Sequence, residues 1–420
     1  MADLTPLYRE TRPYRRCSRC VLDTVGPHPI DFDDDGVCHY CRASDRAVAK
    51  WTLSPEEQRI KFEQAIGAIK ARGAGREYDS ILGMSGGVDS SYVAYLAMKH
   101  GLRPLIIHLD NSWNSELAVK NIENTITRTG FEYYNYVIDW EEFKDMQLAY
   151  LRASVIDTEV VTDQAIFAIL HIVAHRLGVR YILFGDNPKS ERTMPAGWNY
   201  QKNDLSNMRA IHRRFGRKKL RSYPLMGLYD LDWYRKVAGI SYVSLLHYID
   251  VPVSEMKATL EREFGWRDYR WKHCESVFTQ FYQGYILPKK YGVDKRKAHI
   301  TDEILSGLIT RDEAIRRLEQ PYYTDEQLRE DYDFVTRKFD LSAQEFEEIL
   351  AIPPVPHTAF PQDRRGYLWA ARIKLWRIWA GFAAFFTQSS RLMFGQHLFG
   401  GLKKGWMKQV EGNIDKKFKF

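Results

Sequence analysis

The sequence has few cysteines, no long apolar run and no apolar segment at its start. Only 5 of its 420 residues are cysteine, and four of these stand in two Cys-x-x-Cys pairs. No uncharged stretch reaches the ~20 apolar residues that cross a bilayer. The polar stretch from Met1 to Arg16 lacks the apolar centre of a secretory signal. We therefore expect a cytoplasmic, globular protein of two or three modules.

Most of the chain also lacks an excess of basic residues. The net charge of +7 arises from residues 357–420, which hold 12 lysines and arginines against 3 aspartates and glutamates. The preceding residues hold 49 against 51 and are therefore close to neutral. A neutral body argues against nucleic acid as a partner, because nucleic-acid binding needs a basic face.

A glycine turn is the strongest motif in the chain. The residues from Ser80 to Tyr92 read Ser-Ile-Leu-Gly-Met-Ser-Gly-Gly-Val-Asp-Ser-Ser-Tyr, an apolar run, a small polar turn and a helical pattern. Gly86 and Gly87 allow backbone amides to close around an anion at the start of the helix. The turn has no lysine, which excludes a Walker loop. We predict a phosphate site formed by Ser85, Gly86, Gly87, Asp89, Ser90 and Ser91, and the alternative is a plain strand-to-helix turn.

Strand and helix patterns alternate through the next hundred residues. Strands are expected near residues 80–84, 104–110, 133–138 and 180–184, and helices near 55–72, from 88, and near 115–129, 141–153 and 162–177. Such alternation indicates a parallel sheet covered on both faces, with ligands at the carboxyl ends of its strands. Asp89, Asp110, Asp139 and Asp186 each follow a strand. Capping a helix explains Asp110 and Asp139 as well as ligand binding does.

A second polar turn, Gly185-Asp-Asn-Pro-Lys-Ser-Glu191, follows the last of these strands. At the carboxyl edge of a parallel sheet it would face the turn at Ser85. Asp89 and Asp186 would then hold Mg²⁺ against the phosphates of ATP.

The two cysteine pairs have the spacing of a zinc ribbon. Cys17 and Cys20 are followed after 17 residues by Cys38 and Cys41. The segment between the pairs is too polar for a core of its own, so bound Zn²⁺ would have to supply its folding energy. Four thiolates leave no open coordination position, which favours a structural site. Disulfides are the alternative, and a reducing compartment disfavours them.

We divide the chain into a zinc ribbon (1–50), an ATP-binding α/β domain (51–223), a helical substrate region (224–352) and a basic aromatic tail (353–420). The helical region is rich in aromatic and ionic residues, especially between Lys272 and His299. In the tail, the segment from Leu368 to Phe386 combines tryptophans with basic residues. It would lie on an anionic membrane surface, or pack on the body or a partner.

These motifs together resemble the N-acetyl sugar amidotransferase family of the ATP pyrophosphatase superfamily, over residues 14–318. The resemblance rests on the cysteine pairs with Phe32-Asp-x-x-Gly-Val-Cys38, the Ser-Gly-Gly-x-Asp-Ser-Ser turn, Gly-Asp-Asn-x-x-Ser-Glu191, and Asp294-Lys-Arg-Lys-x-His299 followed by Gly307-Leu-Ile-Thr-Arg-Asp-Glu-Ala314. It implies a doubly wound parallel sheet of the adenine nucleotide alpha hydrolase-like type, with a zinc ribbon before it and a helical region after it. Thr301 stands where a serine is more familiar, and Cys274 has no assigned role.

The resemblance also implies an activity. Such an enzyme uses ATP to convert an acetamido group of a nucleotide-linked N-acetyl sugar, here a uronic or related acidic one, to an acetamidino group in O-antigen or flagellin-sugar biosynthesis. Asp89, Asp186, Lys295 and Arg296 would be catalytic. Asp110 and Gly185 would join the ATP site. The sugar substrate would contact Asn187, Glu191, Lys297 and His299.

The source of nitrogen follows from the scarcity of cysteine. A glutaminase needs a nucleophilic cysteine, and Cys274 outside the ribbon lacks a glycine-flanked turn that would expose it. Ammonia would therefore come from a separate glutaminase through a barrel-shaped partner, as the resemblance implies. Two alternatives remain open: tRNA thiolation, which needs spare cysteines, and a non-catalytic nucleotide-binding scaffold.

Overall fold

The computed structural model describes residues 6–8, 11–51, 53–187, 192–269 and 271–363. Its strands are β1 (Ser80–Gly83), β2 (Pro104–Asp110), β3 (Tyr133–Val137), β4 (Tyr181–Leu183) and β5 (Ser241–Val243). The helices up to β5 are α1 (His39–Trp51), α2 (Pro55–Arg72), α3 (Val88–Lys99), α4 (Glu116–Thr129), α5 (Trp140–Ala153), α6 (Val160–Arg176), α7 (Leu205–Phe215) and α8 (Leu228–Lys236). After β5 follow η1 (Leu245–Tyr248), α9 (Val253–Phe264), α10 (Val277–Phe281), η2 (Tyr282–Tyr291), α11 (Arg296–Leu305), α12 (Arg311–Glu319), α13 (Asp325–Lys338), α14 (Ala343–Ala351) and η3 (His357–Ala359).

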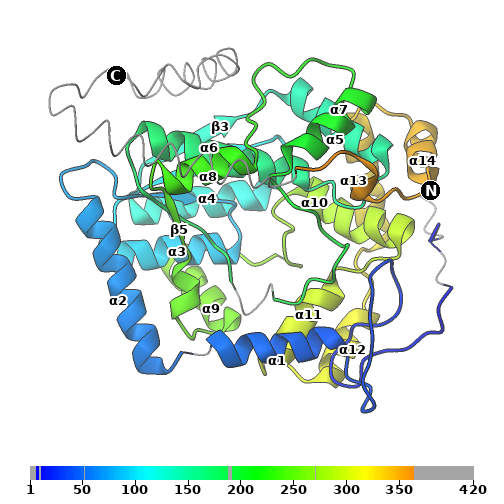
Figure 1. Ribbon diagram of the computed structural model, residues 1–420, viewed down its shortest axis with the longest axis horizontal. Coiled ribbons are helices and arrows are strands. Elements are labelled where there is room, and N and C mark those ends of the chain that lie inside the picture. The colour runs from blue at the N-terminus through cyan, green and yellow to red at the C-terminus, as the bar shows by residue number, and fades with distance from the viewer. Residues whose placement is uncertain (1–5, 9–10, 52, 188–191, 270, 364–420) are drawn as a thin grey trace, which may run out of the picture.

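The centre of the fold is a parallel five-stranded sheet in the order β3-β2-β1-β4-β5 (Figure 1). β1 pairs with β2 on one side and with β4 on the other, so the strand order reverses between β1 and β4. This is a doubly wound α/β fold, as the alternating sequence pattern predicts. In such folds ligands bind beyond the carboxyl ends of the strands at the reversal point, where both polar turns lie.

The side chains of successive strand residues lie on opposite faces of the sheet. Ile81 and Ile182 belong to the core that α5 and α6 cover. Leu82 and Leu183 belong to the core formed with α2, α3, α4 and α9. Both faces are apolar because helices cover both, which is the reason the strands read as continuous apolar runs.

Several predicted elements agree closely with the structure. The helix expected at 115–129 is α4, and the Ser115 side chain accepts a hydrogen bond from the Ala118 amide as its N-cap. Asp139 caps α5 by accepting from the Glu142 amide at 3.0 Å, which confirms the capping alternative for this residue. Asp110 instead accepts from the Ser112 amide at 2.9 Å, within the turn that follows β2.

The region predicted to be helical, residues 224–352, also contains the strand β5. Residues Ser241–Val243 pair with Tyr181–Leu183 and extend the sheet. Three residues are too few to show a strand period, so the pairing with β4 decides their conformation. In the same region η2 is a π-helix that contains Pro288. Proline has no amide hydrogen to donate, and departures from α-helical pairing are found around such residues.

The chain after the Pro353-Pro-Val-Pro356 segment packs against the rest of the protein. The Asn207 side chain donates to the His357 carbonyl at 2.8 Å, and the Asp363 carboxylate accepts from the Leu205 amide at 3.0 Å. Residues up to 363 therefore pack against α7. The aromatic segment from Leu368 to Phe386 lies outside the described residues. Within the part of the chain that is described, no helix is long and apolar enough to cross a membrane.

Candidate nucleotide site and cysteine cluster

The glycine turn joins β1 to α3 at the reversal point of the sheet. Gly86 has a φ of +87°, and a Cβ there would lie 2.9 Å from the Ala118 carbonyl oxygen. Both observations require glycine. The Gly86 carbonyl accepts hydrogen bonds from the Trp266 indole at 2.9 Å and the Tyr269 hydroxyl at 3.1 Å. Two donors on one carbonyl fix the plane of this peptide. Trp266 and Tyr269, far from the turn in sequence, therefore hold its conformation.

Hydroxyl groups line the turn on its inner side. The Ser85 hydroxyl lies 3.2 Å from that of Ser90 and accepts from the Gly87 amide at 3.2 Å. Gly87 is the N-cap of α3 and has no side chain to cap the helix, so the first-turn amides of α3 suit an anion. The Ser91 hydroxyl is fully buried and lies 4.0 Å from the Met84 sulfur, on the core side of the turn. Of the hydroxyls predicted to meet phosphate, those of Ser85 and Ser90 are thus the ones placed at the turn.

The second polar turn lies directly against the first. The Asn187 amide group donates to Asp89 Oδ1 at 2.9 Å. A Cβ on Gly185 would lie 2.9 Å from the Ser90 amide nitrogen, so glycine allows the two backbones to approach closely. Lys272 Nζ lies 3.5 Å from Asp89 Oδ2. The structure therefore brings Asp89, Gly185 and Asn187 together, and adds a lysine from far along the chain.

Asp186 has a different environment from Asp89. Its carboxylate lies 3.0 Å from His247 Nε2 on η1, and the side chain is half exposed. The carboxylates of Asp89 and Asp186 therefore have separate partners. Both oxygens of Asp89 face donors, the Asn187 amide group and the Lys272 ammonium. A magnesium ion shared by the two carboxylates would therefore require Asp89 to release a donor and Asp186 to release His247.

Glu275 is a component of this site that the sequence did not single out. Its Oε1 atom lies 1.9 Å from the position that a Cβ on Gly87 would take. The Ser115 amide donates to the Glu275 carbonyl, and the Val277 amide to the Trp113 carbonyl, each at 2.8 Å. These backbone bonds fix the segment before α10 beside the turn after β2. Burial raises the pKa of the Glu275 carboxyl. No motif marks such a residue, because its role depends on a contact across 188 positions of sequence.

The four basic residues between 295 and 299, two predicted to be catalytic and two to contact the sugar, lie in three environments. The Arg296 guanidinium forms a fork on Asp294 and lies over the rings of Trp271 and Tyr322 at 5.1 and 5.7 Å. The Lys297 ammonium donates to both carboxylate oxygens of Asp23 at 2.9 and 2.8 Å.

The other two basic residues, His299 and Lys295, lie beside aromatic rings. The His299 ring lies 5.5 Å from that of His273. Lys295 is 8% exposed, and burial lowers the pKa of its ammonium. Glu191 lies outside the described residues.

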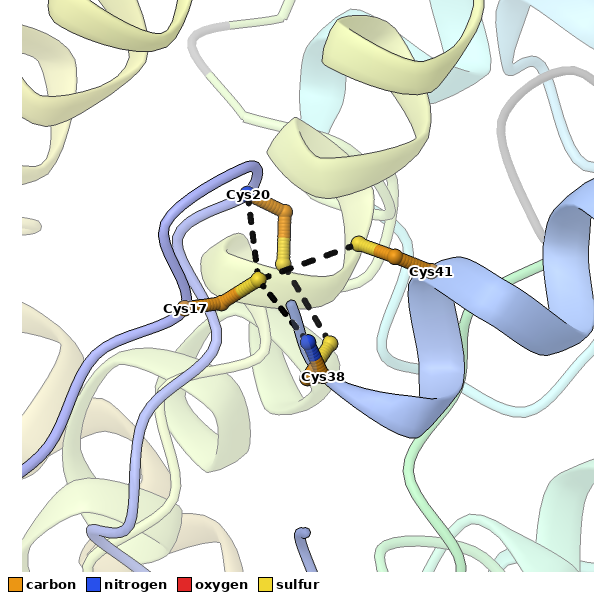
Figure 2. Close-up of side chains that lie close together, drawn as sticks. All are labelled: Cys17, Cys20, Cys38 and Cys41. Carbon is orange, nitrogen blue, oxygen red and sulfur yellow. Dashed lines mark hydrogen bonds between the residues drawn. The ribbon is translucent and has the colours of Figure 1, made fainter. Parts of the chain in front are cut away.

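The four paired cysteines converge on one point (Figure 2). Their sulfur atoms all lie within 4.8 Å of one another, with Cys17 to Cys41 at 4.0 Å and Cys20 to Cys38 at 3.7 Å. Zn–S bonds of about 2.3 Å in a tetrahedron place sulfurs roughly 3.8 Å apart, whereas a disulfide needs about 2.05 Å. All four thiols are free and buried. The cluster therefore fits Zn²⁺.

The cysteine segment docks on the helices that carry the predicted substrate residues. Arg311 of α12 donates to the carbonyls of Cys20 and Cys17 at 3.1 and 2.9 Å. Lys297 of α11 reaches Asp23 in the same segment, and the two helices lie beside it (Figure 1). The cysteine segment thus supports the position of α11.

Together, the sheet order and the paired turns define a doubly wound α/β protein with two polar turns in contact at the reversal point. Residues 275–375 match the family model for the C-terminal domain of WbpG-like LPS biosynthesis proteins. This match agrees with the family resemblance of the sequence and continues past the tail boundary predicted at residue 353. No curated protein sequence matches the chain.

Two solved structures show distant likeness. One is an NMN synthetase from Francisella tularensis, with 17% identity over 69% of this chain and 98% of that chain, at a TM-score of 0.26. The other is the U34-tRNA thiolase NcsA from Methanococcus maripaludis with its [4Fe-4S] cluster, with 14% identity over 73% and 88% of the two chains, at a TM-score of 0.30.

Proposed function

We propose that this protein is an ATP-dependent amidotransferase of lipopolysaccharide sugar biosynthesis. Its substrate is a nucleotide-linked N-acetyl sugar, and its product carries an acetamidino group in place of the acetamido group. The observation that carries the proposal is the contact between the two polar turns, Asn187 to Asp89, at the reversal point of the sheet. The family match of residues 275–375 supports the sugar pathway.

The chemistry divides into activation and displacement. ATP supplies an electrophilic α-phosphorus, which the acetamido oxygen attacks as pyrophosphate leaves and the acetamido nitrogen gives up its proton to water. The product is an imidoyl adenylate, from which ammonia displaces AMP. The turn at Ser85, Gly87 and Ser90 would hold the departing phosphates with amides and hydroxyls, and Lys272 would offset their charge beside Asp89. The protein's contribution is positioning and charge neutralisation.

Sulfur transfer is the second candidate chemistry, and Cys274 disfavours it. The thiol of Cys274 is 5% exposed and lies 3.4 Å from the Tyr322 hydroxyl. Burial raises its pKa to about 11. A relay needs an accessible thiolate, and this residue supplies neither access nor ionisation at neutral pH.

We further propose that ammonia reaches the site from a separate glutaminase through a barrel-shaped partner. The same features of Cys274 argue against a glutaminase nucleophile in this chain. The purified protein should then use ammonium salts but not glutamine, and the partner pair should restore the use of glutamine.

The proposal is tested by pyrophosphate release. Purified protein with ATP, magnesium and ammonium should release pyrophosphate with N-acetylated nucleotide sugars and not with tRNA. Release with tRNA alone, accompanied by thiolated product, would contradict the proposal.

A further inference from the structure

A second group of polar side chains lies at the start of α6, outside the two turns. Thr158 is 1% exposed, and its hydroxyl has no hydrogen-bond partner among the described residues. Glu159 accepts from the Thr279 hydroxyl through Oε2 at 2.9 Å. Its other oxygen, Oε1, is buried and also lacks a partner in the described part of the chain. Buried acceptors are nearly always paired, so each of these unpaired oxygens indicates a place for a donor.

Charged groups surround this pair from every element packed on it. Asp157 is fully buried and accepts from Lys202 Nζ at 2.7 Å, and Asp163 on α6 lies 3.1 Å from the same ammonium. Lys295 stands over the Tyr282 ring at 5.4 Å, and no carboxylate of the described residues forms an ion pair with its ammonium. Its charge acts on both Asp157 and Glu159.

With all groups ionised, three carboxylates face two ammonium groups. The cluster thus carries a single net negative charge, which one bound monovalent cation would neutralise. Since Thr158 and the free oxygen of Glu159 are covered, the ligand must be small. Both conditions fit ammonium better than a sugar ring.

This charged cluster lies at the carboxyl edge of the sheet, as the two polar turns do. Leu170 of α6 packs against Gly83 at the carboxyl end of β1, within 3.2 Å of where a Cβ would stand. The first residue of α6 lies ten positions earlier, which places it about 15 Å farther along the helix and beyond the carboxyl edge of the sheet.

One segment connects the two places. Glu275, beside Gly87, precedes Thr279, beside Glu159, by four residues, with the extended N-cap Ser276 of α10 between them. The segment that flanks the glycine turn therefore also supplies the hydroxyl that holds Glu159.

We propose that Glu159 is the general base that converts bound ammonium to ammonia for attack on the activated sugar. This inference rests on the amidotransferase function proposed above and names the residue that prepares its nucleophile. Thr158 and Thr279 are positioning residues for the ammonium and for the carboxylate. Burial and the neighbouring Asp163 raise the pKa of the Glu159 carboxyl to about 7, which suits a group that accepts and releases a proton near neutrality.

The Glu159 carboxylate accepts one proton from ammonium, and the electron pair of that N–H bond remains on nitrogen. Ammonia then forms a bond to the imidoyl carbon, and the bond from that carbon to the AMP oxygen breaks, with the electron pair leaving on AMP. Two hydrogens stay on the new nitrogen and the third passes to the sugar nitrogen, which gives an amidinium product. Glu159 returns its proton to water.

The test compares two nucleophiles in wild-type protein and in Glu159→Gln. Hydroxylamine is unprotonated at neutral pH and needs no base before it attacks, whereas ammonium does. Glu159→Gln should lower ammonium-dependent amidine formation by about 100-fold or more. With hydroxylamine its rate should stay within about threefold of wild type. The matched control is Glu255→Gln, an exposed glutamate on α9, which should match wild type with both nucleophiles.

Thr279→Val supplies a second readout. It removes the hydrogen bond that lowers the pKa of Glu159. The acid limb of the ammonium-dependent pH–rate profile should therefore move to higher pH, and the hydroxylamine profile should not. An unmoved limb would overturn the assignment.

Other outcomes separate the two proposals. Equal losses with ammonium and hydroxylamine in Glu159→Gln, or no loss with ammonium, would overturn the role of Glu159 while the amidotransferase function stands. Sugar-dependent exchange of labelled pyrophosphate into ATP, measured on wild-type protein without a nitrogen source, reports the first half-reaction. Its absence would overturn the proposed function and this inference with it.

Discussion

Gly87 and Glu275 should be energetically coupled, because the position of one depends on the size of the other. Gly87 has φ −73° and ψ 168°, a conformation that alanine adopts without strain. The backbone therefore gives no reason for glycine here. The steric reason is Glu275, whose Oε1 and Cδ would lie 1.9 and 3.0 Å from the added methyl carbon.

Replacement of Gly87 by alanine should therefore act through the glutamate. The Glu275 carboxylate must turn away from a buried position, and forcing an extra methyl group into packed surroundings costs about 1–3 kcal/mol. We expect Gly87→Ala to lower the free energy of unfolding in urea by this amount. In the double variant Gly87→Ala/Glu275→Ala the methyl group has room, so most of that loss should disappear.

The control is Gly67→Ala, because a Cβ there meets nothing within 4 Å on the exposed side of α2. It should stabilise the protein by about 0.5–1 kcal/mol through helix propensity. Additive changes in the free energy of unfolding would contradict the contact between Gly87 and Glu275. A coupling energy below about 0.5 kcal/mol between Gly87→Ala and Glu275→Ala would show that the two residues do not meet.

Four further outcomes follow from the structure. Lys297→Met leaves the buried Asp23 carboxylate without its cationic partner and should lower the free energy of unfolding in urea by about 3–5 kcal/mol. The double variant Lys297→Met/Asp23→Asn should recover most of this loss. Equal losses in the single and double variants would contradict the ion pair. Asp89→Ala should abolish pyrophosphate release and leave the urea midpoint unchanged, and retained turnover would remove Asp89 from the site. Freshly purified, reduced protein should contain one zinc per chain by metal analysis, and Cys17→Ser should lose the metal and solubility; zinc-free folded protein would refute the cluster. Burial lowers the pKa of His357 to about 4, so the unfolded state binds the proton first and stability falls as pH drops below about 6.5. Between pH 7 and pH 5, the free energy of unfolding of His357→Gln should fall by about 2 kcal/mol less than that of wild type. Parallel curves of stability against pH for the two proteins would show that His357 is not buried in its neutral form.

Much of the sheet could be predicted because its signals are local. Ile81 and Leu82 stand in an apolar run with Gly86 and Gly87 directly after it, and these neighbours alone mark a strand and a turn. The same holds for the cysteine pairs, whose spacing within a short segment fixes the cluster. The capping alternative for Asp139 was also readable, since it depends on the next three residues.

The remaining features depend on long-range packing. β5 is three residues long and forms because β4 offers an edge. Glu275 and Lys272 lie beside the glycine turn, and the backbone of Glu275 and Val277 pairs with residues after β2, a contact with no sequence pattern. Glu159 stands between two helices without a motif, and only the arrangement of α6, α10 and Lys295 reveals its unpaired oxygen.

We propose that this protein splits ATP to AMP and pyrophosphate in order to amidate an N-acetyl sugar. Purified protein can be incubated with ATP, magnesium, ammonium and a panel of nucleotide-linked N-acetyl sugars, and AMP, pyrophosphate and the mass of the sugar followed. AMP and pyrophosphate should form in equal amounts, together with a sugar product in which NH has replaced the acetamido oxygen. Formation of ADP and phosphate, or of AMP with the acetamido group unchanged in every sugar tested, would contradict the proposal.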